Sequence, residues 1–216
     1  MRPGHRKGGA LITGTFVTFE GIDGSGKSTQ LDLLKRRLEA LGKTVAVIRE
    51  PGGTELSEQI RTLLLDHRSR NLSERAEALL FSTARAQLVH QVIVPALERG
   101  EVVLCDRYAD STIAYQGYGR ELPLDEIITT QEFATNHLRP DLKVLLDLPV
   151  DVAATRLLGF FADRMESVGR AFQERVRQGY LKMSQSAPEE WLVVNGDQPK
   201  EKIAEEIASH VEKEIL

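Results

Sequence analysis

One eight-residue segment restricts the fold of this chain more than any other. Residues 21–28 read Gly-Ile-Asp-Gly-Ser-Gly-Lys-Ser and match the phosphate-binding pattern GxxxxGK[ST] at every fixed position. An apolar, β-branched run at 16–19 precedes this segment, and leucines at helical spacing follow it over 29–41. A strand, a glycine-rich loop and a helix in this order predict a binding site for a nucleoside triphosphate.

Each residue type in the segment suits that chemistry. The three glycines let the loop bend without side chains in the way, so that backbone N–H groups can point at phosphate oxygens. Lys27 adds a positive charge, Ser28 offers a hydroxyl to a magnesium ion, and the next helix starts with its N–H groups toward the phosphates. The residues predicted to bind the triphosphate are Gly21, Ile22, Asp23, Gly24, Ser25, Gly26, Lys27, Ser28 and Thr29.

Composition sets further bounds. With 216 residues and a net charge of −4, the chain is expected to form one domain over 15–216, with no general attraction to nucleic acid or membranes. The single cysteine, Cys105, excludes an intramolecular disulfide and suits a reducing cytoplasm. Residues 1–14 lack the apolar segment of a secretory signal and are expected to be a disordered extension, with a nucleic-acid-binding arm as the weaker alternative.

Four more apolar runs, at 44–48, 102–105, 144–148 and 191–194, alternate with helical patterns. Buried strands joined by long crossovers predict a five-stranded parallel sheet with helices on both faces, an α/β fold. A long helix is expected over 74–99, with a kink at Pro95 in its last turns. The last helix carries an apolar stripe expected to face the core, formed by Ile203, Ile207, Val211 and Ile215.

Polar residues follow three of these strands, at the edge where open parallel sheets bind ligands. The first strand leads into the glycine-rich loop, the second into Arg49 and Glu50, and the third into Asp106 and Arg107. Asp106 is predicted to join Ser28 at the magnesium ion, and Arg107 to bind a second phosphate. Alternatively, Asp106 and Arg107 cap the following helix, and Glu50 merely neutralises Arg49.

Phe81 and Arg85 lie four residues apart in the 74–99 helix and therefore on one face. A ring beside a guanidinium can stack on a base and donate hydrogen bonds to its edge. The plainer interpretation makes Phe81 a core residue and Arg85 a solvated one. Spacing alone does not decide between them.

Several motifs follow one another along the chain: FEGIDGSGKST at 19–29, REPGGT at 49–54, LLFSTARAQL at 79–88, DRYADSTIAYQGYGR at 106–120, ADRME at 162–166 and GY at 179–180. On these motifs the chain from residue 14 onwards resembles the bacterial thymidylate kinases, nucleoside monophosphate kinases with the P-loop NTPase fold and a short lid. The resemblance implies phosphoryl transfer from ATP to dTMP, giving ADP and dTDP for DNA synthesis. It also implies a magnesium cofactor and a cytoplasmic homodimer.

The resemblance also implies roles for individual residues. Phe81 would stack on thymine while Arg85 bonds its edge, and Arg49 and Arg107 would bind the acceptor phosphate. Asp23 would help to place that phosphate or the metal. The residues implied for dTMP binding are Arg49, Glu50, Phe81, Arg85, Arg107, Thr112, Tyr115 and Gln116; those implied for catalysis are Asp23, Lys27, Arg107 and Arg164.

The expected lid, at about 156–165, departs from the family pattern. Where the position of Asp23 is acidic or neutral, a basic lid usually supplies the cation for the transition state, but residues 156–164 are basic only at the two ends. Arg164 is expected near the phosphates and Arg156 beside adenine. Phe160 and Phe161 either pack on the closed body or form an apolar surface.

Three other functions are weighed. A kinase for AMP, UMP or dCMP is disfavoured by the pairing of Phe81 and Arg85. A GTP-dependent switch requires an NKxD motif, and the nearest segment, Asn195-Gly196-Asp197, lacks the lysine and the spacing. An ATP-binding scaffold without catalysis is suggested only by the unusual lid.

Overall fold

The computed structural model describes residues 6–7, 10–11, 13–69, 71–158, 164–165 and 168–214. A five-stranded sheet in the order β4-β5-β3-β6-β7 forms its centre, and all four strand pairs are parallel. This confirms the predicted sheet. The strands are β3 (Thr15–Glu20), β4 (Val45–Arg49), β5 (Val102–Asp106), β6 (Leu142–Asp147) and β7 (Trp191–Asn195).

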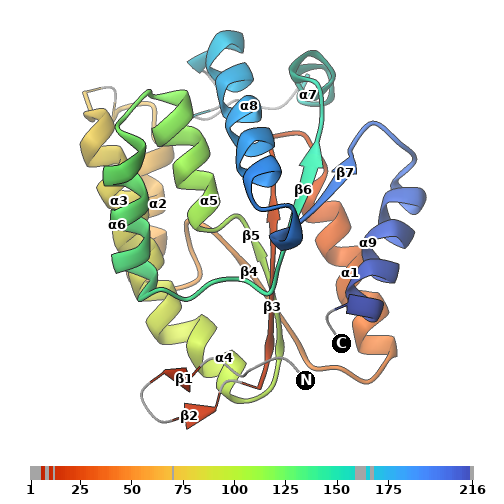
Figure 1. The fold of residues 1–216 in the computed structure, drawn as a ribbon. Helices are drawn as coiled ribbons and strands as arrows, with labels where there is room; N and C mark the ends of the chain where they lie inside the picture. The colour runs from red at the N-terminus through yellow and green to blue at the C-terminus, as the bar shows by residue number, and fades with distance from the viewer. Residues whose placement is uncertain are drawn as a thin grey trace.

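Helices cover both faces of the sheet, as predicted (Figure 1). One face is covered by α1 (Lys27–Ala40) and α9 (Lys200–Glu214), whose apolar residues form one core cluster with those of the strands. Phe16 packs in a cluster on the opposite face from its neighbour Val17, because successive strand residues point to opposite sides. The sheet is therefore buried on both sides.

The other face carries the remaining helices, several of which build the site described below. The α-helices are α2 (Glu55–Leu65), α3 (Glu74–Leu88), α4 (Val94–Glu98), α5 (Ala109–Thr112), α6 (Leu124–Thr135), α7 (Val150–Arg156) and α8 (Arg170–Ser186). Two π-helical segments, Val89–Ile93 and Ile113–Gly119, continue α3 and α5, and a 3-10 helix spans Pro188–Glu190.

The helix predicted over 74–99 is interrupted by the first of these π-helical segments. Pro95 has no N–H to donate to the carbonyl of Gln91, and its ring crowds that carbonyl. A regular α-helix is therefore strained here, and a wider π turn comes immediately before α4. The expected disturbance at Pro95 thus takes the form of a π turn.

Other expectations about the core are confirmed. Ile203, Ile207 and Val211 are at most 3% exposed and pack into the core from α9, whereas Ile215 lies outside the described residues. Cys105 is a buried free thiol.

Among the described helices, none is long and apolar enough to cross a membrane.

At the N-terminus, β1 (Arg6–Lys7) and β2 (Ala10–Leu11) pair as an antiparallel two-stranded sheet. The rest of 1–12 lies outside the described residues, so the disordered extension stays a prediction. The same holds for much of the expected lid, since residues 159–163, including Phe160 and Phe161, are not described.

Candidate active site

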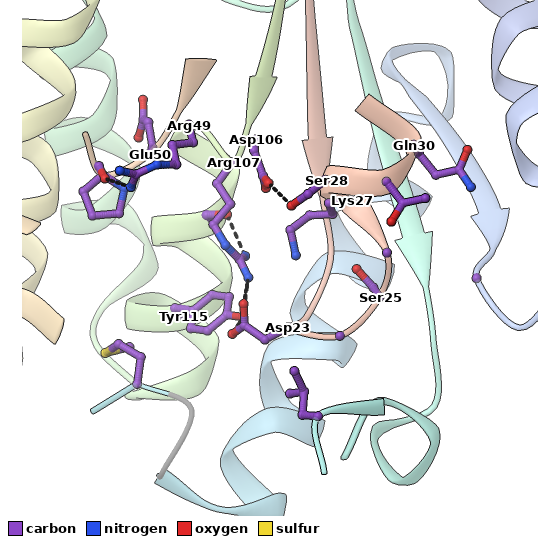
Figure 2. A pocket seen from close by; sticks show the side chains of 18 of the residues that line it. Asp23, Ser25, Lys27, Ser28, Gln30, Arg49, Glu50, Asp106, Arg107 and Tyr115 are labelled. Carbon is purple, nitrogen blue, oxygen red and sulfur yellow. Dashed lines mark hydrogen bonds and ion pairs between the residues drawn. The ribbon is translucent and has the colours of Figure 1, made fainter. Parts of the chain in front are cut away.

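A cavity of about 690 Å³ lies at the carboxyl-terminal edge of the sheet. Its walls come from the glycine-rich loop, from the segments after β4 and β5, and from the segment after β7. Parallel strands end at one edge, so the polar residues that follow them are brought together here. In Figure 2, Arg49 and Glu50 lie on one side of Arg107, and Ser28 and Gln30 lie on the other.

The glycine-rich loop requires its glycines for two separate reasons. Gly21, Gly24 and Gly26 have φ angles of 134°, 78° and 97°, a region that side chains disfavour. A Cβ on Gly21 would also lie 2.7 Å from the carbonyl oxygen of Leu146. The loop leads directly into α1, whose N-terminus has no side-chain cap, so its first N–H groups are available to phosphate oxygens.

Lys27 is buried at the start of α1 and bends back over the loop. Its Nζ donates to the carbonyl oxygens of Gly21 and Ile22 at 3.1 and 3.0 Å. Burial, together with the nearby Arg107, lowers the pKa of Lys27. The ammonium group is therefore held inside the loop, where a phosphate can replace the carbonyl contacts.

Ser28 and Asp106 meet across the sheet edge. The Ser28 hydroxyl donates to Asp106 Oδ2 at 3.0 Å. One hydroxyl and one carboxylate suit Mg²⁺, which prefers oxygen ligands and usually takes the others from water and substrate phosphates. The described residues contain no group of three or more His, Cys, Asp or Glu that could hold a metal alone, so this pair needs such outside ligands.

Arg107 connects the loop with the other half of the cavity. Its guanidinium donates to Asp23 at 2.6 Å, to the Gly21 carbonyl at 3.0 Å and to the Tyr115 hydroxyl at 3.1 Å. It also lies over the Tyr115 ring, 4.9 Å from the centroid. Arg107 has φ of 72°, an uncommon conformation for a residue other than glycine. The alternative that the Asp106–Arg107 pair caps α5 is wrong, because that helix has no side-chain cap.

Asp23 remains ionised in this environment. Burial alone would raise its pKa, but the positive charges of Arg107 and Lys27 outweigh that effect and hold the pKa at about 2. The carboxylate therefore balances Arg107 until an anionic ligand competes for the guanidinium.

Arg49 and Glu50 are adjacent in sequence but have different partners. The Arg49 side chain, half exposed, forms an ion pair with Glu58 at 3.3 Å. Glu50 is buried and pairs with Arg85. The alternative that Glu50 merely neutralises Arg49 is therefore wrong.

Arg85 is a buried cation at the inner wall of the cavity. Only 1% exposed, it donates to Glu50 at 2.7 Å and to Thr112 at 2.9 Å, and it also bonds Gln131. This arrangement rules out the solvated residue considered from the sequence. Phe81 lines the same cavity and packs against the cluster of Ile60, Leu64 and Ala84.

Glu77 is a buried carboxylate that the sequence analysis missed. It accepts from Gln116 at 2.8 Å and forms ion pairs with Arg120 at 3.2 Å and Arg164 at 2.7 Å. Arg164 also donates to the carbonyl of Leu64 at 2.7 Å. In the sequence, Glu77 is indistinguishable from any acid that stabilises the first turn of a helix.

The two expected lid cations therefore lie apart. Arg156 lines the cavity and donates to the carbonyl of Gly196 at 3.0 Å, beyond the glycine-rich loop. Arg164 would have to leave Glu77 and Leu64 to reach a phosphate, so its catalytic role stays a prediction.

Ser111 and Tyr180 also contact Arg107 and were absent from the predicted set. Each of the two hydroxyls accepts a hydrogen bond from the Arg107 guanidinium at 3.3 Å. Ser111 lies in the DRYADST segment, whereas Tyr180 comes from α8, far away in sequence. Both residues belong to motifs that carry the resemblance, DRYADSTIAYQGYGR for Ser111 and the GY pair at 179–180 for Tyr180, but neither was given a role.

Comparisons with known proteins find similar sequences over most of the chain. A family model described as thymidylate kinase matches residues 19–207. The thymidylate kinase of Citrifermentans bemidjiense is 50% identical over 190 residues, covering 85% of this chain and 84% of the relative. That of Thermosipho africanus is 46% identical over 200 residues, covering 93% and 98%. That of Bifidobacterium longum is 47% identical over 205 residues, covering 94% and 99%.

The buried pair makes a prediction about stability. Arg85→Ala leaves Glu50 buried without its partner and should lower the free energy of unfolding by about 3–5 kcal/mol. Arg49→Ala, which breaks the exposed pair with Glu58, should cost at most about 1 kcal/mol. Urea denaturation of both variants measures the difference. Equal losses would show that the Arg85–Glu50 pair is not the stronger constraint.

Proposed function

This chain belongs to the thymidylate kinase family, and on that premise we propose how its residues hold the two nucleotides. The enzyme transfers a phosphoryl group from ATP to dTMP and releases ADP and dTDP. The observation that carries the proposal is the position of Arg107, which bonds to the glycine-rich loop and to Tyr115 in the same cavity.

ATP is proposed to occupy the side of the cavity formed by the loop and the start of α1. The triphosphate would take the N–H groups of residues 21–29 and the ammonium group of Lys27. Adenine would lie beside Arg156 and the segment after β7, which line the cavity beyond the loop. Mg²⁺ would be held by Ser28 and Asp106, and when bound it neutralises charge on the phosphates.

dTMP is proposed to occupy the other side. Phe81 offers a ring for stacking on thymine, while Arg85 and Thr112 offer polar atoms to its edge. Tyr115 and Gln116 line the space for the deoxyribose, and Arg49 and Arg107 supply the charge for the phosphate, with Glu50 holding Arg85 in place. All these residues line one cavity.

Catalysis in this arrangement depends on position and charge. Two anionic phosphates repel each other, and the transfer needs no covalent intermediate with the protein, so cations that bring them together lower the barrier. Arg107 would exchange part of its bond with Asp23 for the acceptor phosphate. Lys27 would leave the loop carbonyls for the donor phosphate.

The reaction excludes the three functions weighed from the sequence. A GTP-dependent switch and a scaffold without catalysis do not phosphorylate a nucleotide, and a kinase for AMP, UMP or dCMP has another acceptor. The family and the relatives are kinases of thymidylate.

An assay of ADP formation tests the proposed site. With ATP and each monophosphate in turn, turnover should be fastest with dTMP. Lys27→Ala and Arg107→Ala should each lower turnover on the order of a hundredfold, the scale for losing one preorganised charge contact. Lys35→Ala, on the exposed side of α1, is the matched control and should keep full activity. Near-normal turnover in either site variant would remove that residue from the mechanism.

Arg164 has a separate prediction. If it leaves Glu77 to stabilise the transition state, Arg164→Ala should lower kcat on the order of a hundredfold and leave KM for dTMP unchanged. Steady-state kinetics with dTMP varied at saturating ATP measures both. A raised KM with normal kcat would instead assign Arg164 to the acceptor side, through Glu77 and Gln116.

A cytoplasmic homodimer without nucleic-acid partners completes the proposal. Large apolar side chains are exposed on α2, α3 and α6, which lie together on one side of the molecule (Figure 1). They are Leu56 (42% exposed), Leu63 (54%), Leu79 (57%), Ile128 (39%) and Phe133 (86%). A second copy could cover this surface. The buried thiol of Cys105 and the net charge of −4 support the location and the absence of nucleic acid.

The dimer is tested by a charge at Phe133, the most exposed of these apolar side chains. Phe133→Asp should convert the protein to a monomer, because a carboxylate cannot be desolvated in such an interface without a partner. Val193→Asp on β7, a residue 43% exposed, is the control and should leave the mass unchanged. Sedimentation equilibrium distinguishes the two states, and a dimeric Phe133→Asp variant would place the interface elsewhere.

A further inference from the structure

Glu20 is a buried acid beside the active site to which the proposed function gives no role. It is the last residue of the central strand β3, directly before the glycine-rich loop, and it is fully buried. An ionised carboxylate loses its hydration in such a position, which is unfavourable unless hydrogen bonds compensate. Its partners therefore indicate what it does.

The side-chain hydrogen bonds that Glu20 makes with described residues all lead toward Arg107. Oε1 accepts from the backbone N–H of Tyr108 at 2.8 Å. Oε2 accepts from the Ser111 hydroxyl at 2.6 Å and from the Tyr180 hydroxyl at 3.0 Å. Tyr108 follows Arg107 in the chain. The hydroxyls of Ser111 and Tyr180 also accept hydrogen bonds from the guanidinium of Arg107.

The direction of these bonds is important. A hydroxyl has one hydrogen to donate and two lone pairs that accept. When Ser111 and Tyr180 donate to Glu20, their lone pairs are left to face the Arg107 guanidinium. The bond to the N–H of Tyr108 fixes the backbone next to the left-handed φ of 72° at Arg107. Glu20 thus orients Arg107 from behind, through its backbone and through its side-chain partners.

The charges around Glu20 fit this arrangement. Burial, and then the neighbouring Asp110, raise the pKa of Glu20 to about 7, while Ser111, Arg107 and Tyr180 oppose the rise. Asp110 in turn forms an ion pair with Lys143 at 3.2 Å. The hydrogen-bond donors and Arg107 are thus the contacts that favour the ionised carboxylate.

We infer that Glu20 is a positioning residue for Arg107, acting through Ser111, Tyr180 and the N–H of Tyr108. It holds the guanidinium at the point where it contacts Asp23 and, in the proposed function, the acceptor phosphate. The inference rests on that placement of Arg107. Glu20 itself is not among the residues that line the cavity.

Glu20→Gln is the first test, because it keeps the size and replaces one acceptor oxygen by a donor. The amide NH₂ cannot accept, so it faces either the two hydroxyls or the N–H of Tyr108 without receiving a hydrogen bond. In both orientations at least one of the contacts that position Arg107 is lost. We expect kcat/KM for dTMP to fall about 10- to 100-fold, since small displacements of a positioning group have effects of this size. KM for ATP should change less than about twofold, because Glu20 orients Arg107, and Arg107 is proposed to bind the phosphate of dTMP.

Thr18→Val is the matched control. Thr18 lies two residues earlier on the same face of β3, it is fully buried, and its hydroxyl has no hydrogen-bond partner among the described residues. This variant alters the same part of the strand without touching Arg107. Its dTMP kinetics should match those of the unaltered enzyme.

A double-mutant cycle separates positioning from a general loss of structure. If Glu20 acts through Tyr180, the loss in Glu20→Gln/Tyr180→Phe should be clearly smaller than the product of the two single losses. Multiplicative losses, or equal damage to ATP and dTMP kinetics, would overturn the inference. If Glu20→Gln does not fold, Ser111→Ala and Tyr180→Phe take its place, and normal dTMP kinetics in both would overturn it.

Arg107→Ala distinguishes this inference from the proposed function. Normal dTMP kinetics in Arg107→Ala would refute the placement of Arg107 itself. Impaired Arg107→Ala together with normal Glu20→Gln would refute only the role of Glu20.

Discussion

The ion pair between Arg107 and Asp23, 2.6 Å long, is the interaction on which the rest of the site depends. It joins the residue after β5 to the glycine-rich loop after β3, and these two strands are neighbours in the sheet. The pair therefore sets the distance between the group proposed to hold the acceptor phosphate and the loop proposed to hold the donor. In a reaction controlled by positioning, that distance decides whether the phosphates can meet.

The pair also balances charge before the nucleotides bind. Lys27 and Arg107 both bond the carbonyl of Gly21, so two cations lie close together in a buried region. Asp23, ionised with a pKa of about 2, offsets their repulsion. Phosphates bring more negative charge than one carboxylate supplies, so they can take over these contacts. The same residues can thus stabilise the loop and bind substrate.

Local patterns in the sequence were enough to predict the sheet, the loop and the residues at the strand ends. Apolar runs and glycines act over a few neighbours, so they are visible in a linear sequence. The partners of buried charges are not visible in the same way. Glu50 bonds Arg85, 35 residues away, instead of its neighbour Arg49, and Glu20 bonds Tyr180 across 160 residues. Such pairings follow from the packing of whole helices against the sheet, which no local pattern encodes.

The same limit applies to the cation of the transition state. The family resemblance favours Arg164, because a basic residue in the lid is the usual source of that charge in such members of the family. In the structure Arg164 bonds Glu77 and Leu64, and Arg156 bonds Gly196, whereas Lys27 and Arg107 contact the loop itself. Transfer that relies on the two cations in contact with the loop depends strongly on the orientation of each one. The buried carboxylate of Glu20, behind Arg107, is therefore most useful in a chain whose lid is basic only at its ends.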